Sequence, residues 1–192
     1  RASQENPMKM WINDFDNNGT FEQIITRNID GKDHPIHMKK ELTNQISFLK
    51  KQNLKASEYA HKTVSELFPE EIFKKTIMKK MNISETIIAI NDGNGKFTVK
   101  KLPTRVQLSC INGISCIDID KDGDLDLIMA GNNYEFKPQF SRLDADYGDV
   151  LLNDGNLKFT WQSHDKSGIF IKSEVKHIKQ FKDKNSKVFF LF

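Results

Sequence analysis

Short apolar runs on either side of two acidic stretches predict pairs of β-strands. Residues 11–13 precede the first stretch and residues 24–25 follow it, while residues 115–117 and 127–128 flank the second in the same way. Runs of this length, bounded by turn-forming residues, are typical of strands. Each acidic stretch is therefore predicted to be a loop that joins two strands.

A different periodicity occupies residues 36–83, where apolar residues recur every three or four positions. That spacing places them on one face of an α-helix. We expect three short amphipathic helices, whose apolar positions are Met38, Leu42, Ile46 and Leu49, then Ala60, Val64, Leu67 and Phe68, then Phe73, Ile77 and Met81.

The strand–loop–strand unit is repeated along the chain. The acidic stretches at residues 14–22 (DFDNNGTFE) and 118–126 (DIDKDGDLD) lie 104 positions apart, whereas the related NDGNGKF and NDGNLKF segments at residues 91–97 and 153–159 lie 62 apart. Asn-Asp-Gly between apolar runs is a strong hairpin signal. The difference of 42 residues predicts an insertion in the first copy, which the helical segment supplies.

A third copy has lost its acidic set. The positions 61 residues beyond the second stretch keep apolar neighbours but carry Lys179, Phe181, Asp183 and Lys187. A repeat of about 60 residues with four short strands has the size of one β-propeller blade. One blade cannot bury both faces of its sheet, so such repeats must stack.

These patterns predict a mainly β fold, a partial β-propeller of about two and a half four-stranded antiparallel blades with an inserted small α-helical segment. Because the chain begins at Arg1 and ends on an apolar run, we expect a segment of a longer protein that holds the rest of the propeller. The predicted parts are a first blade at 8–35 plus 84–103, the insertion at 36–83, a second blade at 104–166 and a partial third blade at 167–192.

The second acidic stretch has the spacing of a cation-binding loop. Oxygens at alternate positions of a tight loop can converge on one hard cation, and Gly123 permits the sharp turn. Calcium suits this set because it accepts six to eight oxygens in flexible geometry. The stretch is not an EF-hand, because Met129 stands where the closing glutamate belongs and a strand should follow. The predicted ligands are Asp118, Asp120, Asp122, the backbone carbonyl of Asp124, and Asp126.

The first acidic stretch follows the same plan with Asn18 in place of one of the aspartates, so we expect it to bind more weakly. The alternative for both stretches is a polar Asx-type turn without a metal. The predicted ligands of the first loop are Asp14, Asp16, Asn18, the backbone carbonyl of Thr20, and Glu22.

The pattern D-x-D-x-D-G-x-x-D, together with the turn N-D-G-x-G-x-F, resembles the FG-GAP and VCBS repeats of integrin α-subunit propellers, cartilage acidic protein and many secreted bacterial proteins. It is most similar to VCBS-repeat proteins of the Bacteroidetes type, which often carry an ASPIC/UnbV domain elsewhere. Residues 130–134, 142–148 and 150–155 are similar to their blade sequence, as is the helical insertion with residues 57–60. The resemblance implies calcium as the cofactor, the ligands named above, and a secreted or cell-surface location that includes the outer membrane or periplasm.

Charge and cysteine content argue against nucleic-acid binding and against a zinc site. The net charge is +3, and the lysines gather in residues 39–80 and 172–187 without arginine clusters or interleaved aromatics. A solvated helix face explains them better than nucleic-acid binding. No apolar stretch reaches the length of a membrane helix. Cys110 and Cys116 form no zinc motif; they would pair if the chain turned sharply between them, and otherwise are small buried residues.

Several other polar and aromatic residues have two interpretations each. A ligand pocket at a propeller rim or a structural loop would account for Asp144, Asp146 and Asp149 beside Arg142, and we favour the structural loop. We expect Trp11 and Trp161 to be blade core rather than sugar platforms, and none of the five histidines has metal-ligand spacing.

We expect a calcium-stabilised binding or scaffolding module and not an enzyme, because no G-x-S-x-G, P-loop, G-x-G-x-x-G or H-E-x-x-H motif occurs and no residue is assigned a catalytic role. Its ligand would be an unidentified protein or glycan. One alternative is part of a propeller-type carbohydrate-active enzyme whose catalytic residues lie partly outside this segment. Another is an interaction protein that acts through the lysine-rich helices of residues 38–81.

Overall fold

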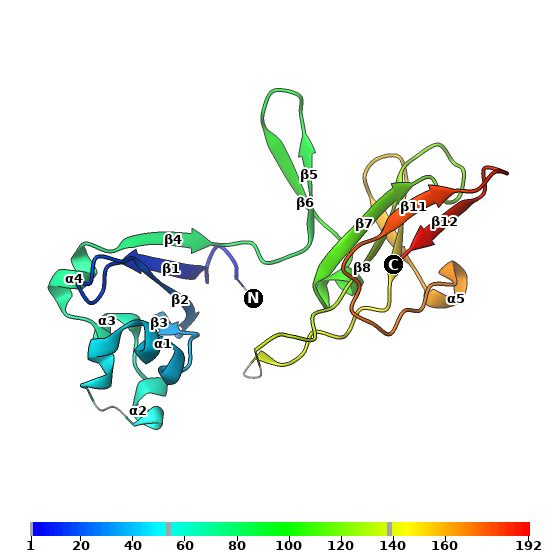
Figure 1. Cartoon of the computed structure of the whole chain (residues 1–192). Coiled ribbons are helices and arrows are strands. Elements are labelled where there is room, and N and C mark those ends of the chain that lie inside the picture. Colours follow the sequence, from blue (N-terminus) through cyan, green and yellow to red (C-terminus); the bar gives the residue numbers. More distant parts are fainter. Residues whose placement is uncertain (1, 53–54, 138–139) are drawn as a thin grey trace. The chain divides into compact units, whose positions relative to one another are not determined.

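The computed structural model describes residues 2–52, 55–137 and 140–192. Its described residues form a mainly β protein with four antiparallel sheets, two of them four-stranded, which confirms the predicted β class. The chain divides into two compact units, Arg1–Ser84 and Glu85–Phe192 (Figure 1). Each unit contains one of the two acidic loops, so each is described by itself.

The first unit is built on a four-stranded sheet in the order β3-β2-β1-β4. Strand β1 (Met8–Asn13) pairs with β2 (Glu22–Ile29), and β2 continues into β3 (Lys32–Pro35) through a tight turn. Along β2 the side chains of Glu22, Ile24 and Thr26 are buried while Gln23 and Arg27 are exposed. This alternation is that of a strand with one buried face.

The third predicted helix is wrong over its second half. Helix α4 (Glu70–Lys74) ends early, and Ile77–Met81 forms strand β4, which pairs with β1 along its whole length. The helical spacing of Phe73, Ile77 and Met81 was misleading because β1 offers a free edge, and pairing with that edge satisfies the backbone groups of both strands. All five β4 side chains are exposed, as expected for an edge strand. The segment predicted as an insertion therefore also completes the sheet.

The remaining helices gather on one side of this sheet, as Figure 1 shows. They are α1 (Lys39–Gln45), the 3₁₀ turn η1 (Ser47–Lys50), α2 (Ala56–Ala60), α3 (Val64–Leu67) and α4. Their apolar faces and the sheet share one core rather than two. The buried residues of that core are Phe15, Ile24, Leu42, Ile46, Leu49, Tyr59, Val64, Leu67 and Phe68.

The second unit contains a four-stranded antiparallel meander in the order β10-β9-β8-β7. Its strands lie inside residues 104–166 and pack on a core of Leu102, Val106, Met129 and Leu151. The hairpin of β5 (Ile87–Asn91) and β6 (Phe97–Lys101) forms a separate two-stranded sheet. The meander and its flanking turns are η2 (Thr104–Gln107), β7 (Ile111–Ile117), β8 (Asp126–Gly131), β9 (Asp149–Asn153), β10 (Phe159–Gln162) and α5 (His164–Ser167).

A last hairpin, β11 (Lys179–Lys182) with β12 (Val188–Leu191), occupies the position of the third copy. Its turn is closed by Asp183, whose carboxylate accepts the backbone N–H groups of Asn185 and Lys187, both at 2.8 Å. Asp92 closes the β5–β6 turn and Asp154 the β9–β10 turn with the same pair of bonds, two and four residues ahead. The shared spacing D-x-N-x-K is thus a turn signal that the sequence analysis missed at residue 183.

The structural interpretation of the acidic residues near Arg142 is confirmed. Asp146 is buried, and its carboxylate accepts the backbone N–H groups of Gly131 and Gly148. Asp149 is buried too and accepts the indole N–H of Trp161 at 2.7 Å. Arg142 pairs with Asp144 at 3.3 Å.

The predicted burial is wrong for the cysteines and confirmed for the tryptophans. Both cysteines are free, Cys110 being half-buried and Cys116 exposed on the extended strand β7, so the prediction of two small buried residues is wrong. Trp11 and Trp161 are partly buried and pack against the two cores, as predicted.

Among the described residues, no helix is long and apolar enough to cross a bilayer.

Candidate metal sites

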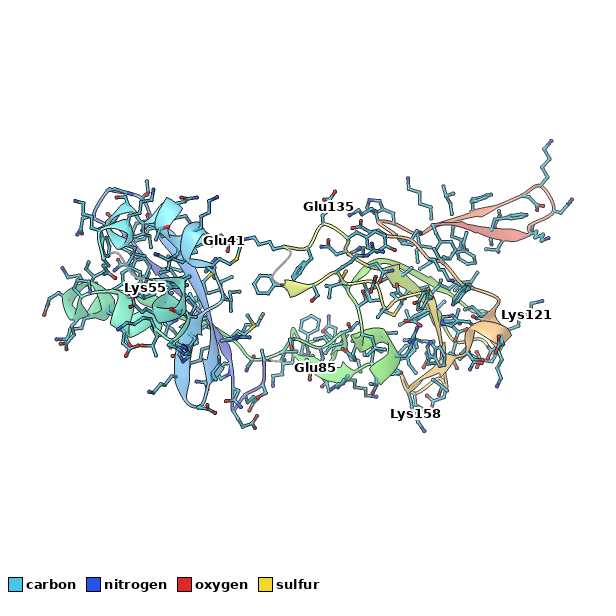
Figure 2. All side chains as sticks on the ribbon, turned by 90° about the horizontal axis from the view of Figure 1, so that it is seen from below. Glu41, Lys55, Glu85, Lys121, Glu135 and Lys158 are labelled. Carbon is cyan, nitrogen blue, oxygen red and sulfur yellow. The ribbon has the colours of Figure 1, made fainter. Side chains whose placement is uncertain are left out.

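The two acidic loops have the same local conformation. The carboxylate of Asp14 accepts the backbone N–H of Gly19 at 2.9 Å, and that of Asp118 accepts the N–H of Gly123 at 3.1 Å. Both glycines have positive φ, +86° and +98°, in which an L side chain is strained. The fourth loop residue is left-handed in both, with Lys121 at φ 65° marking the second loop in Figure 2.

In the second loop three carboxylates converge. One oxygen each of Asp118, Asp120 and Asp126 lies within 4.8 Å of the others. Oδ1 of Asp118 is buried and has no hydrogen-bond partner. A buried carboxylate oxygen without a donor is costly, and a cation placed among the three carboxylates removes that cost.

Asp126 is the anchored member of this group. Its side chain is 0% exposed; Oδ2 accepts the N–H of Ile119 at 2.7 Å and Oδ1 that of Asn153 at 2.8 Å. The first bond closes the loop on itself, and the second ties it to the end of β9. The carboxylate is therefore held in place before any ion arrives.

In the first loop the converging carboxylates belong to Asp14, Asp16 and Glu22, again within 4.8 Å. Oδ1 of Asp16 is buried without a hydrogen-bond partner. Glu22 is held from two sides, because Oε2 accepts the N–H of Phe15 at 2.9 Å and Oε1 accepts the hydroxyl of Thr20 at 3.1 Å. The bond from Phe15 corresponds to the one from Ile119 in the second loop.

Asp122 lies outside the close carboxylate group of its loop, and the side chains of Asp122 and Asn18 both accept backbone hydrogen bonds. The side chain of Asp122 accepts the N–H of Asp124 at 2.9 Å, and that of Asn18 accepts the N–H of Thr20 at 2.8 Å. Both are exposed and stabilise the turn of their own loop. Thr20 and Asp124 were expected to bind through backbone carbonyls, which stays a prediction.

The carboxylate of Asp124 has a different neighbour. A Cβ atom added to Gly155 would lie 2.6 Å from its Oδ2, so this carboxylate closely approaches the backbone of the β9–β10 turn. The Asn-Asp-Gly turn thus needs glycine there for two reasons, the positive φ of 78° and the space. The turn was predictable from Asn-Asp-Gly, whereas its contact with the acidic loop depends on tertiary packing.

Desolvation and the crowding of carboxylates raise the pKa of Asp120 above its ordinary value. Partial desolvation contributes most, followed by the negative charges of Asp122 and Asp126. Like charges at this distance disfavour the ionised form unless a cation neutralises them. Each loop therefore has the donor set, the crowding and the unpartnered oxygen of a site that can hold a metal ion.

We expect the second loop to lose cation affinity as the pH is lowered. The loss should begin at a higher pH than it would if Asp120 had the ordinary aspartate pKa of about 3.9. Because its pKa is raised, protons compete with the cation for Asp120 from a higher pH. Without cation, lowering the pH has the opposite effect on folding stability. Protonated Asp120 stabilises the fold below its unfolded-state pKa, and this stabilisation disappears as the pH rises through its folded-state pKa.

Calorimetric cation titrations over about pH 7 to 4 measure this effect. The variant Asp120→Asn, which cannot titrate, should bind more weakly at neutral pH and show a shallower pH dependence. An unchanged pH profile in Asp120→Asn would contradict the assignment.

Phe15 is the residue of this region whose role the sequence analysis missed. It lies inside the first loop, is 0% exposed, and its ring centroid is 4.4 Å from that of Phe68. The aromatic residue between two aspartates was the available signal. It fixes the loop to the helical core, whereas its counterpart Ile119 is 39% exposed.

The fold and the two loops together define a mainly β protein with duplicated acidic sites suited to a metal ion. No family model, curated protein or solved structure matches this chain. Its function must therefore be inferred from the sites themselves.

Proposed function

We propose that this chain is a calcium-binding segment of an FG-GAP/VCBS-type β-propeller, a binding or scaffolding module of a secreted or cell-surface bacterial protein and not an enzyme. One observation carries the proposal: the same nine-residue loop is built twice, 104 residues apart, each time with a buried carboxylate oxygen that lacks a donor. A polar turn that needed no ion would not require that oxygen in both copies.

Calcium fits these loops better than the other common hard cation. The donors are all oxygens, the loops are irregular, and the carboxylates enter from both ends of each loop. Calcium accepts such flexible geometry at 2.3–2.6 Å, whereas magnesium demands a near-ideal octahedron. Extracellular modules use calcium sites with dissociation constants of about 10⁻⁴ to 10⁻³ M, so an extracellular or periplasmic location would keep these loops occupied.

The surface of the second unit supports stacking of blades. Large apolar side chains are exposed on three of its sheets: Phe97 on β6, Ile114 on β7 and Leu191 on β12 are between 56% and 62% exposed. Large apolar side chains exposed to this degree are suited to burial against a partner surface. In a propeller, the sheets of neighbouring blades would cover it.

We expect calcium titration of the whole chain to show two sites, the Asp118–Asp126 loop tighter than the Asp14–Glu22 loop because Asp122 replaces the uncharged Asn18 among its predicted ligands. Isothermal calorimetry measures the affinities, and thermal unfolding in calcium against chelator measures the stabilisation. Saturation at one hundred times the dissociation constant should stabilise each unit by about 2.7 kcal/mol. Magnesium is the matched control and should bind more weakly. Absence of both heat and stabilisation with calcium would refute the proposal.

A further inference from the structure

A hollow of about 550 Å³ opens beside the first acidic loop, within the first unit. Its size falls in the range of small-ligand pockets, about 300–1,000 Å³. One wall comes from the loop and from β2, and another from His37, which precedes helix α1, and from Gln45 at the end of that helix, which the Glu41 label marks in Figure 2. The lining residues are Thr20, Phe21, Glu22, Gln23, Ile25, His37 and Gln45.

The hollow borders the metal cluster directly. Glu22 belongs both to the wall of the hollow and to the group of three converging carboxylates. Thr20 also lines the hollow, and its hydroxyl donates to Glu22. A calcium ion takes six to eight oxygens, more than the carboxylates of Asp14, Asp16 and Glu22 supply as single donors. An ion bound here would therefore have coordination positions available to oxygens of a ligand in the hollow.

The lining chemistry favours a neutral, hydroxyl-rich ligand. Phe21 offers a large aromatic side chain that is 68% exposed, beside the side-chain amides of Gln23 and Gln45. Nε2 of His37 accepts the backbone N–H of Ile25 at 3.2 Å. Glu22 is the sole carboxylate in the lining, and the cation would offset its charge.

The edge of strand β2 adds backbone groups. The C=O of Ile25 accepts the N–H of Ile36 at 3.0 Å and its own N–H donates to His37, so these groups point away from β1. Backbone direction repeats every two residues along a strand. The N–H and C=O of Gln23 therefore point the same way, beyond the end of β3 and toward the hollow.

We infer that this hollow binds a neutral saccharide, with hydroxyl oxygens completing the coordination of the calcium ion and a sugar ring lying on Phe21. The inference rests on the proposed calcium site and adds a ligand class to it. It is specific to the first loop, because the position equivalent to Phe21 in the second loop is Leu125, which has no aromatic ring.

The test uses the whole chain and a panel of neutral polysaccharides, namely mannan, galactan, xylan and dextran, in affinity electrophoresis. Runs are compared in about 5 mM calcium, above the 10⁻⁴–10⁻³ M dissociation constants of extracellular sites, and in chelator. We expect retardation by at least one polysaccharide in calcium and none in chelator. Phe21→Ala and Gln45→Ala should each weaken it, the former about tenfold as for an aromatic hot spot.

Leu125→Ala is the matched control, since Leu125 is 61% exposed at the same loop position and outside the hollow. It should leave retardation unchanged. Calcium calorimetry on the same samples separates the two failures. Absence of calcium binding overturns the calcium site, whereas normal calcium binding without retardation, or retardation insensitive to Phe21→Ala, overturns the saccharide site alone.

Discussion

Phe15→Ala is expected to lower the free energy of unfolding of the first unit by about 3–5 kcal/mol, the usual cost of removing a fully buried phenylalanine ring. The ring is 0% exposed and contacts Phe68, so its loss leaves a cavity where the acidic loop meets the helices. Cation affinity at the first loop should fall too, because the buried ring fixes the position of the Phe15 backbone N–H that holds Glu22.

Hydrogen-exchange mass spectrometry resolves this effect, because it reports on peptides of each unit separately. The matched control is Ile119→Ala, at the same loop position of the second unit. Since Ile119 is 39% exposed, its truncation should cost less than about 1 kcal/mol. Equal losses in the two variants, or faster exchange in the second unit of Phe15→Ala, would show that Phe15 does not anchor the first loop.

Asp126→Ala is the second change with a large expected effect. It should destabilise the second unit by about 3 kcal/mol or more even without cation, because both hydrogen bonds of a fully buried carboxylate are lost. The N–H groups of Ile119 and Asn153 would be left without their acceptor. Cation binding at this loop should disappear, while the first loop continues to bind.

Asp120→Asn provides the comparison, since Asp120 is an exposed member of the same carboxylate group. It should weaken cation binding without lowering the stability of the cation-free protein. Denaturant unfolding in chelator and calorimetry in calcium distinguish the two variants. If Asp126→Ala kept both its cation affinity and its stability, the second loop would not be a metal site of the proposed kind.

The lysine-rich helices are part of the first unit rather than a separable arm. Leu42, Ile46 and Leu67 of the helical segment share a core with Phe15 and Ile24 from the loop and sheet. Removing residues 38–81 would expose that core and remove β4. A deletion therefore cannot test the interaction hypothesis independently of the first acidic loop, and substitutions of exposed lysines would be needed.

Local sequence was sufficient for the features that depend on few neighbours. The acidic loops were predictable because alternating oxygens and a glycine with positive φ produce the same turn wherever they occur, as Asp14 and Asp118 show. The hairpin turns were predictable from Asn-Asp-Gly for the same reason. Helix α1 followed from its apolar spacing, since its burial depends on a single face.

Long-range contacts determined the rest. Residues 77–81 have helical spacing but form β4, because the unpaired edge of β1 provides backbone partners that no local pattern reveals. Asp126 and Asp122 are both aspartates of one loop. Asp126 is buried and converges with its neighbours because Asn153 from a distant strand holds it, whereas Asp122 is exposed. Spacing along the chain identifies residues that can ligate, whereas packing against distant strands and helices selects those that converge.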